Sequence, residues 1–282
     1  KVRQVVRAAK ERGIPIRVGV NEGSLPPLPS LAEDELPPPK PQRMVDAALW
    51  EIGILQEMGF EDIKISLKAF DVPTMVTAYR EIAKRVPYPL HLGVTEAGTP
   101  GAGSVRSAVG IGILLAQGIG DTIRVSLAAD PAEELPVAWS ILASLNIRQR
   151  GAIILACPTC GRIEVDLIPL ANQVEAHFQK LGKPITVAVM GCVVNGPGEA
   201  RDADIGLAAG KAKGAIFRKG QVVRTVPEEQ FLSALIEEGQ RVIAEKLGGA
   251  PPAATGPADD PDAVIPMTAV ERSARPGRVA RR

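Results

Sequence analysis

The sequence predicts an α/β protein built in two consecutive parts. Up to about residue 149, short β-rich runs alternate with amphipathic helical segments, which is the pattern of repeated strand–helix units. From residue 150 onward the pattern changes to a smaller set of strands and helices that contains every cysteine of the chain. With 45% hydrophobic residues, the chain has enough apolar side chains to build a large core.

Four strand–helix units make up the first part. Strands are expected at 16–21, 62–69, 89–98 and 121–130, with helices at 44–60, 72–86 and 104–120 and a further helical segment at 1–13. The expected strands are apolar and β-branched, which suits a parallel sheet buried on both faces. Eight such units close a barrel of about 250 residues, so four make half of one. Because the chain opens on a helical segment, we expect residues 1–149 to be the C-terminal half of a TIM-type (β/α) barrel, with more chain before Lys1.

Polar side chains occur near the ends of all four expected strands. They are Arg17, Asn21, Lys68, Glu96, Arg124 and Ser126. The carboxyl ends of parallel strands form the ligand-binding rim of such folds, and arginine can hold phosphate oxygens in a bidentate fork. Cations with Asn and Ser donors therefore favour a phosphorylated substrate, and one carboxylate suits proton or hydroxyl chemistry. A solvated strand end or a structural ion pair accounts for any single one of these residues equally well, but four consecutive strands with such ends favour a binding rim.

The second part is expected to form a small α/β domain over 150–248. One strand is expected to lead into a cysteine pair over 151–162, and another opens into a glycine-rich loop over 184–200. Helices are expected at 166–182 and 227–247, with a β-rich stretch at 204–225. Two segments lack such patterns: 25–41 is Pro- and acid-rich, a loop over the rim or a disordered insertion, and 249–282 is expected to be a disordered tail.

All three cysteines fall in one window with metal-ligand spacing. Cys157 and Cys160 form a Cys-x-x-Cys pair, Cys192 follows from a separate strand-like segment, and Glu199 comes seven residues later. Two thiolates at this spacing can grip one metal centre, and a third can close around it. A cubane iron-sulfur cluster needs four ligands, so three cysteines leave one iron for an oxygen donor or for substrate. Glu199 is the best-placed oxygen donor.

Three alternative roles for the cysteines stay open. A zinc site of three thiolates with one further ligand is possible, although neither His91 nor His177 lies near a cysteine motif. A thioredoxin-type dithiol would not need Cys192 and its flanking glycines. A disulfide scaffold fits least, since an odd cysteine count in 282 residues gives no framework.

Composition excludes two classes of partner. The net charge of +1 provides no long-range field toward nucleic acid or membrane, and 3% aromatic residues argue against base-stacking surfaces. No apolar run approaches the roughly 18 residues of a membrane span, and no signal-like stretch opens the sequence. We therefore expect a cytoplasmic protein that binds neither nucleic acid nor membrane.

Six motifs together resemble one enzyme family. They are IRVGVNEGS, KISLKAFDV, LHLGVTEAG, GIGDTIRVSLAADP, ACPTCGR and GCVVNGPGEA, and the resemblance spans Val2 to Leu247. They are similar to the bacterial 4-hydroxy-3-methylbut-2-en-1-yl diphosphate synthase family of the non-mevalonate isoprenoid pathway. The resemblance implies a barrel followed by an iron-sulfur domain, which reductively opens the ring of 2-C-methyl-D-erythritol 2,4-cyclodiphosphate with loss of water. It also implies flavodoxin or ferredoxin as electron donor and a head-to-tail homodimer.

The resemblance also implies roles for individual residues. Ligands of a 4Fe-4S cluster would be Cys157, Cys160, Cys192 and Glu199. Binders of the diphosphate and hydroxyl groups would be Arg17, Asn21, Lys68, Arg124 and Ser126. Glu96 would be an acid/base, and Asn195 a contact beside the cluster. The chain departs from the family by lacking the first half of the barrel, and the rival hypothesis is a non-catalytic metal-stabilised domain, zinc or iron-sulfur, on a barrel that binds a phosphate ligand.

Overall fold

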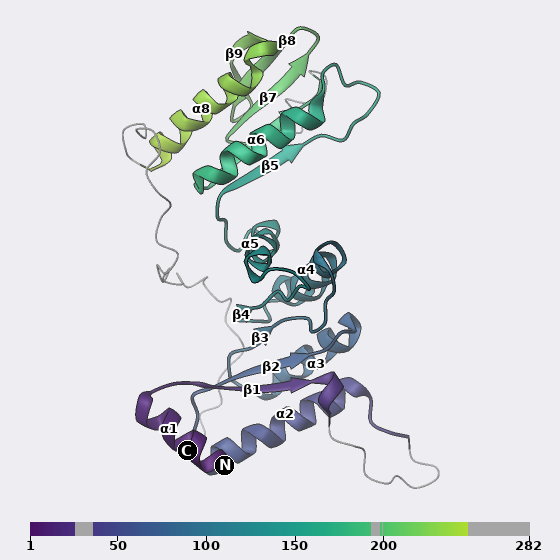
Figure 1. Cartoon of the computed structure of the whole chain (residues 1–282), viewed down its shortest axis with the longest axis vertical. Coiled ribbons are helices and arrows are strands. Elements are labelled where there is room, and N and C mark those ends of the chain that lie inside the picture. The colour runs from purple at the N-terminus through teal and green to yellow at the C-terminus, as the bar shows by residue number, and fades with distance from the viewer. Residues whose placement is uncertain (26–35, 193–197, 199, 248–282) are drawn as a thin grey trace.

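The computed structural model describes residues 1–25, 36–192, 198 and 200–247. Figure 1 shows two bodies that follow one another along the long axis and are joined by a single connection. The predicted tail at 249–282 and most of the predicted loop at 25–41 lie outside the described residues. The end of that loop is corrected, since residues 40 and 41 already belong to a helix.

The N-terminal body contains short parallel strands in chain order. The strands are β1 (Ile16–Asn21), β2 (Ile63–Lys68), β3 (His91–Leu92) and β4 (Thr122–Ile123). Parallel ladders join β1 to β2 and β3 to β4, and a single bridge between Ile65 and Leu90 joins the two pairs. The order is therefore β1-β2-β3-β4, with no closed barrel within the described residues.

Helices alternate with these strands. They are α1 (Val2–Arg12), α2 (Lys40–Glu57), α3 (Val72–Arg85), α4 (Pro100–Ala116) and α5 (Glu134–Ser144), with 3-10 turns η1 (Glu22–Ser24) and η2 (Pro131–Glu133). Neighbouring helices from α2 to α5 pack on one another in chain order. The start of α3 is fixed by Asp71, whose side chain accepts a 2.9 Å hydrogen bond from the Thr74 amide. Helix α5 was not predicted.

Strands β3 and β4 are much shorter than the predicted 89–98 and 121–130, whereas β1 and β2 match their predictions closely. A fully buried tyrosine explains where β2 and β3 separate. The Leu67 amide donates to the Tyr79 hydroxyl at 2.9 Å, and this hydroxyl donates to the His91 carbonyl at 2.5 Å. The hydroxyl therefore stands between two backbone groups that would otherwise pair directly in the ladder. Periodicity along one strand cannot reveal such an insertion.

The C-terminal body is a five-stranded sheet in the order β5-β6-β7-β8-β9. Its strands are β5 (Ala152–Ala156), β6 (Ile185–Met190), β7 (Ile205–Gly210), β8 (Lys213–Arg218) and β9 (Gln221–Pro227). Strands β5, β6 and β7 pair in parallel, β8 is antiparallel to β7, and β9 is antiparallel to β8. Helices α6 (Leu167–Leu181) and α8 (Phe231–Lys246), the latter preceded by the turn η3 (Glu228–Gln230), pack on each other and on the sheet. These elements lie within the predicted segments, except that β9 continues to Pro227, where the helix was expected to begin.

Each body has its own hydrophobic core. Tyr79, Met44 and Ile65 are fully buried in the first, and Phe178 and Val187 in the second. Residues 145–151 connect the two cores. Within this connection the guanidinium groups of Arg148 and Arg150 lie 5.8 and 5.7 Å from the ring centre of Trp139 on α5.

The structure also bears on membrane insertion. Across the residues it describes, no helix is both long enough and apolar enough to cross a membrane.

Candidate active site

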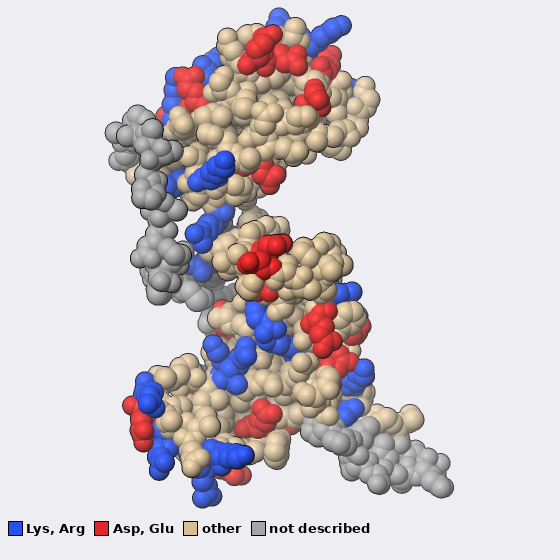
Figure 2. Space-filling view, viewed as in Figure 1, with Lys and Arg blue, Asp and Glu red and all other residues tan. Residues whose placement is uncertain are grey.

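One face of the N-terminal sheet carries most of the predicted binding residues. Val18 and Val20 of β1 are buried in the core, so the alternate side chains of this strand lie on the opposite face. Register then pairs Arg17 with Lys64 and Asn21 with Lys68 across β1 and β2. We call the surface formed by Arg17, Asn21, Lys64, Lys68, His91, Thr122 and Arg124 the cationic face. Figure 2 shows Lys and Arg side chains gathered over the region where Figure 1 places β3 and β4.

Burial and mutual repulsion perturb the charges of the cationic face. Lys68 is 8% exposed, and burial, followed by Arg124 and Arg17, lowers its pKa to about 8. Burial likewise lowers the pKa of His91 to about 4, with contributions from the surrounding cations. A buried ammonium beside two guanidinium groups is unfavourable unless an anion joins it. The arrangement is therefore suited to binding an anion.

Two further features of this face fit a ligand. The Asn21 Oδ1 and Arg124 Nε atoms are buried, and neither has a hydrogen-bond partner within the described part of the chain. Unpaired buried groups are costly, which favours a ligand that satisfies them. Between Lys68 and Arg124 the strand carries Gly93, where an added Cβ would lie 2.9 Å from the Arg124 carbonyl oxygen. Glycine at this position therefore lets the backbone after β3 approach the Arg124 backbone closely.

The loop after β3 holds Glu96 in a strained backbone conformation. Its φ is 53°, in the left-handed region that is costly for a non-glycine residue. Neighbouring contacts fix this loop: the Ala128 amide donates to the Gly98 carbonyl at 2.9 Å, and Arg106 donates to the Ala97 carbonyl. The Arg106 guanidinium also lies 4.2 Å from the ring centre of Phe70, in the loop after β2. These contacts hold the backbone around Glu96, whose side chain is exposed.

The predicted binding residues differ in their positions along the strands. Asn21 and Lys68 end their strands as predicted, while Glu96, Arg124 and Ser126 follow theirs. Only the predicted position of Arg17 at a strand end is corrected, because this residue is the second of β1 and pairs with Lys64 near the start of β2. The prediction missed Lys64 and His91. The two-residue alternation from Lys64 through Ser66 to Lys68 was the signal that could have found the first of them.

The cysteines follow the carboxyl ends of two strands of the C-terminal sheet, and we call this end of the sheet the thiol edge. Strands β5 and β6 are parallel neighbours, and Cys157 follows the first while Cys192 follows the second by two residues. The Gly191 amide donates a 3.2 Å hydrogen bond to the Cys157 Sγ. A Cβ on Gly191 would lie 3.2 Å from the Ile163 side chain and 3.6 Å from that sulfur, so the glycine permits this approach. The Cys157 sulfur thus contacts the backbone of the residue next to Cys192, which comes from a separate segment.

The third thiol is arranged differently. Cys160 is exposed, Cys157 is partly buried and Cys192 is buried, and all three are free. Hydrogen bonds from the Arg162 backbone and side chain lower the pKa of Cys160, which favours the thiolate that binds metal. Within the described ranges, no three Cys, His, Asp or Glu side chains are gathered closely enough to hold a metal ion. Glu199 and Asn195 lie outside those ranges.

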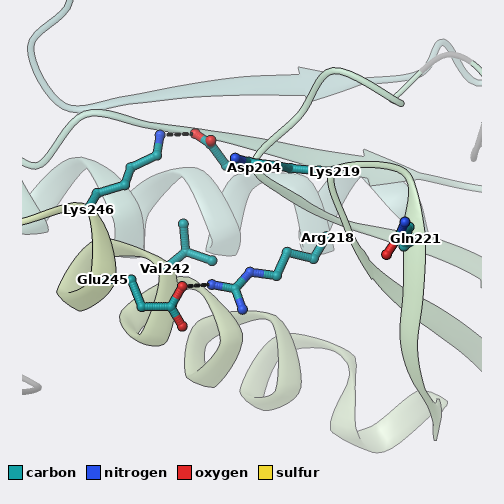
Figure 3. A pocket seen from close by; sticks show the side chains of 7 residues that line it. All are labelled: Asp204, Arg218, Lys219, Gln221, Val242, Glu245 and Lys246. Atoms are coloured by element: carbon teal, nitrogen blue, oxygen red, sulfur yellow. Dashed lines mark hydrogen bonds and ion pairs between the residues drawn. The ribbon is translucent and has the colours of Figure 1, made fainter.

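A cavity of about 360 Å³ lies elsewhere on the C-terminal body, between α8 and the sheet (Figure 3). It is lined by Asp204, Arg218, Lys219, Gln221, Val242, Glu245 and Lys246. Lys246 Nζ lies 2.7 Å from Asp204 Oδ2, and Arg218 pairs with Glu245. Because most of its charges are compensated within the cavity wall, these ion pairs fasten α8 to the sheet and form no ligand site.

Comparison with known proteins places both bodies in one family. The GcpE TIM-barrel domain matches residues 1–139, and the GcpE protein C-terminal domain matches residues 153–241. A relative from Dehalococcoides mccartyi is 57% identical over 240 residues, which cover 84% of this chain and 67% of the relative. Relatives from Geobacter sulfurreducens (53% identical, 87% of this chain and 69% of the relative) and Nocardia farcinica (54%, 88% and 63%) also match. All three bear the name 4-hydroxy-3-methylbut-2-en-1-yl diphosphate synthase (flavodoxin). The chain spans about two thirds of the length of these relatives.

Proposed function

This chain belongs to the GcpE family, and on that premise we propose that it is an iron-sulfur oxidoreductase, a 4-hydroxy-3-methylbut-2-en-1-yl diphosphate synthase that takes electrons from flavodoxin. In this reaction two electrons reductively open the ring of 2-C-methyl-D-erythritol 2,4-cyclodiphosphate, with loss of water. The observation that carries the proposal is the pairing of a cationic sheet face with a set of three free thiols in one chain. The first fits a cyclic diphosphate, and the second fits a redox-active metal centre.

We propose domain limits that follow this division. Residues 1–149 would form the C-terminal half of a TIM-type barrel, and 150–248 an iron-sulfur domain. Support comes from the consecutive parallel strands with helices packed in chain order, as in a barrel wall. The separate cores of the two bodies give further support.

The thiols fit a 4Fe-4S cluster held by Cys157, Cys160 and Cys192, with Glu199 as the fourth ligand. The Gly191 amide beside the Cys157 sulfur fits this assignment, because hydrogen bonds to sulfur tune such clusters. When bound, the cluster would deliver electrons to the substrate. Zinc has no redox chemistry, so the rival hypothesis of a zinc-stabilised domain is not favoured for a relative of flavodoxin-dependent enzymes.

The cationic face and nearby polar residues would bind the substrate, stabilise its charge and transfer a proton. Arg17, Lys68 and Arg124 would hold the diphosphate and stabilise the negative charge that develops as the ring C–O bond breaks. Asn21 and Ser126 would bind substrate hydroxyl groups, and Glu96 would move a proton at the departing oxygen. Asn195 would contact substrate beside the cluster.

We also propose a head-to-tail homodimer, in which the thiol edge of one copy closes over the cationic face of the other. Figure 1 shows β5 running away from the connection between the bodies, so its carboxyl end points away from β1–β4. Cys157 follows that end of β5. A single chain in this arrangement keeps its two half-sites apart, whereas a second copy can unite them.

Anaerobic reconstitution tests the proposed function. The purified chain, incubated with iron and sulfide, should bind about four of each, and the same chain completed to the length of its relatives should turn over the cyclodiphosphate with chemically reduced flavodoxin. Ferredoxin in a parallel assay would show whether the donor is exchangeable. Zinc without acid-labile sulfide in the anaerobically purified protein would contradict the proposal and favour the rival hypothesis.

A further inference from the structure

We infer that His91 is a further ligand-contacting residue of the cationic face, and that its imidazole takes up a proton when a diphosphate group binds there. The inference rests on the proposed function, since it assumes that this face receives the diphosphate. It adds a residue that the predicted substrate-binding set did not contain. It also makes anion binding depend on pH in a range where the other cations of the face stay charged.

The position of His91 is fixed from two sides. On β3 it lies in register with Thr122 of β4, and its Nδ1 is 2.8 Å from the Thr122 hydroxyl oxygen. Its carbonyl oxygen accepts the hydrogen bond from the buried Tyr79 hydroxyl. The ring is half-buried, and no hydrogen-bond partner for its Nε2 occurs among the described residues. One ring nitrogen is therefore anchored, and the other remains for a ligand.

The groups packed around His91 are almost all cationic. Burial has the largest effect on the His91 pKa, and Lys68 and Lys64 on β2, Arg17 on β1 and Arg124 after β4 lower this pKa further. The acidic neighbour is Asp121 at the start of β4, whose Oδ2 accepts a hydrogen bond from the Leu90 amide at 2.9 Å. A diphosphate would offset the cations that now oppose protonation. A second N–H donor would then face the phosphate oxygens.

Linkage gives the sign of the effect. A ligand that binds the protonated ring more tightly raises its pKa, and its affinity must increase as the pH falls through the interval between the two pKa values. That interval starts from the value of about 4 in the free chain. The gain is at most about tenfold per pH unit for one proton. Lys68, with a pKa of about 8, keeps its charge throughout this interval.

The first test is an imidazole titration by NMR with inorganic pyrophosphate as the probe. The chain has two histidines, so a His177→Gln variant assigns both signals. We expect pyrophosphate to raise the pKa of His91 by about two units and to leave that of His177 unchanged. Calorimetry on the same samples measures binding itself. Pyrophosphate binding without a change in the His91 pKa would overturn this inference but leave the anion site in place. Absence of pyrophosphate binding would overturn both the inference and the anion site.

The second test separates ligand contact from a structural role. His91→Gln keeps an amide that can bond to Thr122 but cannot titrate. We expect its pyrophosphate affinity to fall at least fivefold relative to the unchanged chain at pH 5 and to differ less than twofold at pH 7. Ionisation of pyrophosphate affects both proteins alike and cancels in the ratio. A loss of equal size at both pH values would show that His91 only braces the strands, and would refute the inference.

Discussion

The two bodies of this protein prepare their halves of the proposed site in opposite ways. In the N-terminal body the functional side chains project from one sheet face, and parallel register sets their spacing. In the C-terminal body the thiols follow strand ends and differ in exposure from buried Cys192 to exposed Cys160. The side chains of the first half-site thus share one face before any ligand binds, while the thiols proposed for the second differ in exposure.

The two half-sites therefore depend on different sources of free energy. The sheet and its core hold Lys68 beside Arg17 and Arg124 against repulsion, so folding free energy is stored there until an anion arrives. In the second half-site, binding of the proposed metal centre would itself contribute the free energy that gathers the thiolates, as in other metal-supported domains. Substitutions should therefore act on stability in the first body and on metal assembly in the second.

The largest expected effect is loss of the metal centre. Cys157→Ser, Cys160→Ser and Cys192→Ser should each abolish cluster assembly, because a serine oxygen is a poor substitute for thiolate on iron. Iron and sulfide content and visible absorption after identical reconstitution would measure this. The thermal midpoint of the N-terminal body should not change. Full absorbance in any variant would remove that cysteine from the ligand set.

Lys68→Met should separate stability from binding. Removing a charge-assisted bond should weaken pyrophosphate binding by roughly 1.5–3 kcal/mol, while the folded chain at pH 7 becomes more stable because no buried ammonium remains. Urea unfolding and calorimetry would measure the two effects. Reduced stability of this variant would contradict the stored repulsion.

Titration of the same residue should also make the free energy of unfolding depend on pH. The Lys68 pKa is about 8 in the folded chain and near 10.5 in the unfolded chain, so the unfolded chain binds more protons between these values. Lys68 should therefore make the free energy of unfolding increase as the pH rises from about 8 to about 10.5. Comparison of urea midpoints should show this contribution in the unchanged chain and its loss in Lys68→Met. Parallel pH profiles of the two proteins would refute it.

The same contrast governs what the sequence could predict. β-branched residues alternate along Ile16–Asn21 and predicted β1, but the expected burial on both faces is wrong there, since Val18 and Val20 are buried while Arg17 is exposed. The extent of β3 depends on the Tyr79 hydroxyl, a contact between distant segments that no local pattern contains. Spacing predicted three thiols as ligands, but exposure of Cys160 depends on packing. Substrate contact stays a prediction for all six residues, Arg17, Asn21, Lys68, Glu96, Arg124 and Ser126.

Matched glycine substitutions compare the rigidity of the two half-sites. At Gly93 a new Cβ would lie 2.9 Å from the Arg124 backbone carbonyl, which the strand pairing of the cationic face holds in place. Gly93→Ala should therefore destabilise the chain by about 1–3 kcal/mol, as overpacking does, and weaken pyrophosphate binding. Urea unfolding would measure the first effect. An unchanged urea midpoint for Gly93→Ala would show that the cationic face adjusts to the added methyl group.

The smallest effect is expected for Gly191→Ala in the thiol half-site. Here the nearest atoms to a new Cβ are the Ile163 Cγ1 at 3.2 Å and the Leu167 Cδ2 at 3.4 Å, both on side chains that can shift by a few tenths of an ångström. We expect a loss of less than about 1 kcal/mol in unfolding free energy. The variant should still assemble the cluster, but its reduction potential should change, because the Gly191 amide must move relative to the Cys157 sulfur. Urea unfolding and redox titration measure the two effects. If Gly191→Ala proved as destabilising as Gly93→Ala, the thiol edge would be as rigid as the cationic face, and metal binding would find a half-site already formed.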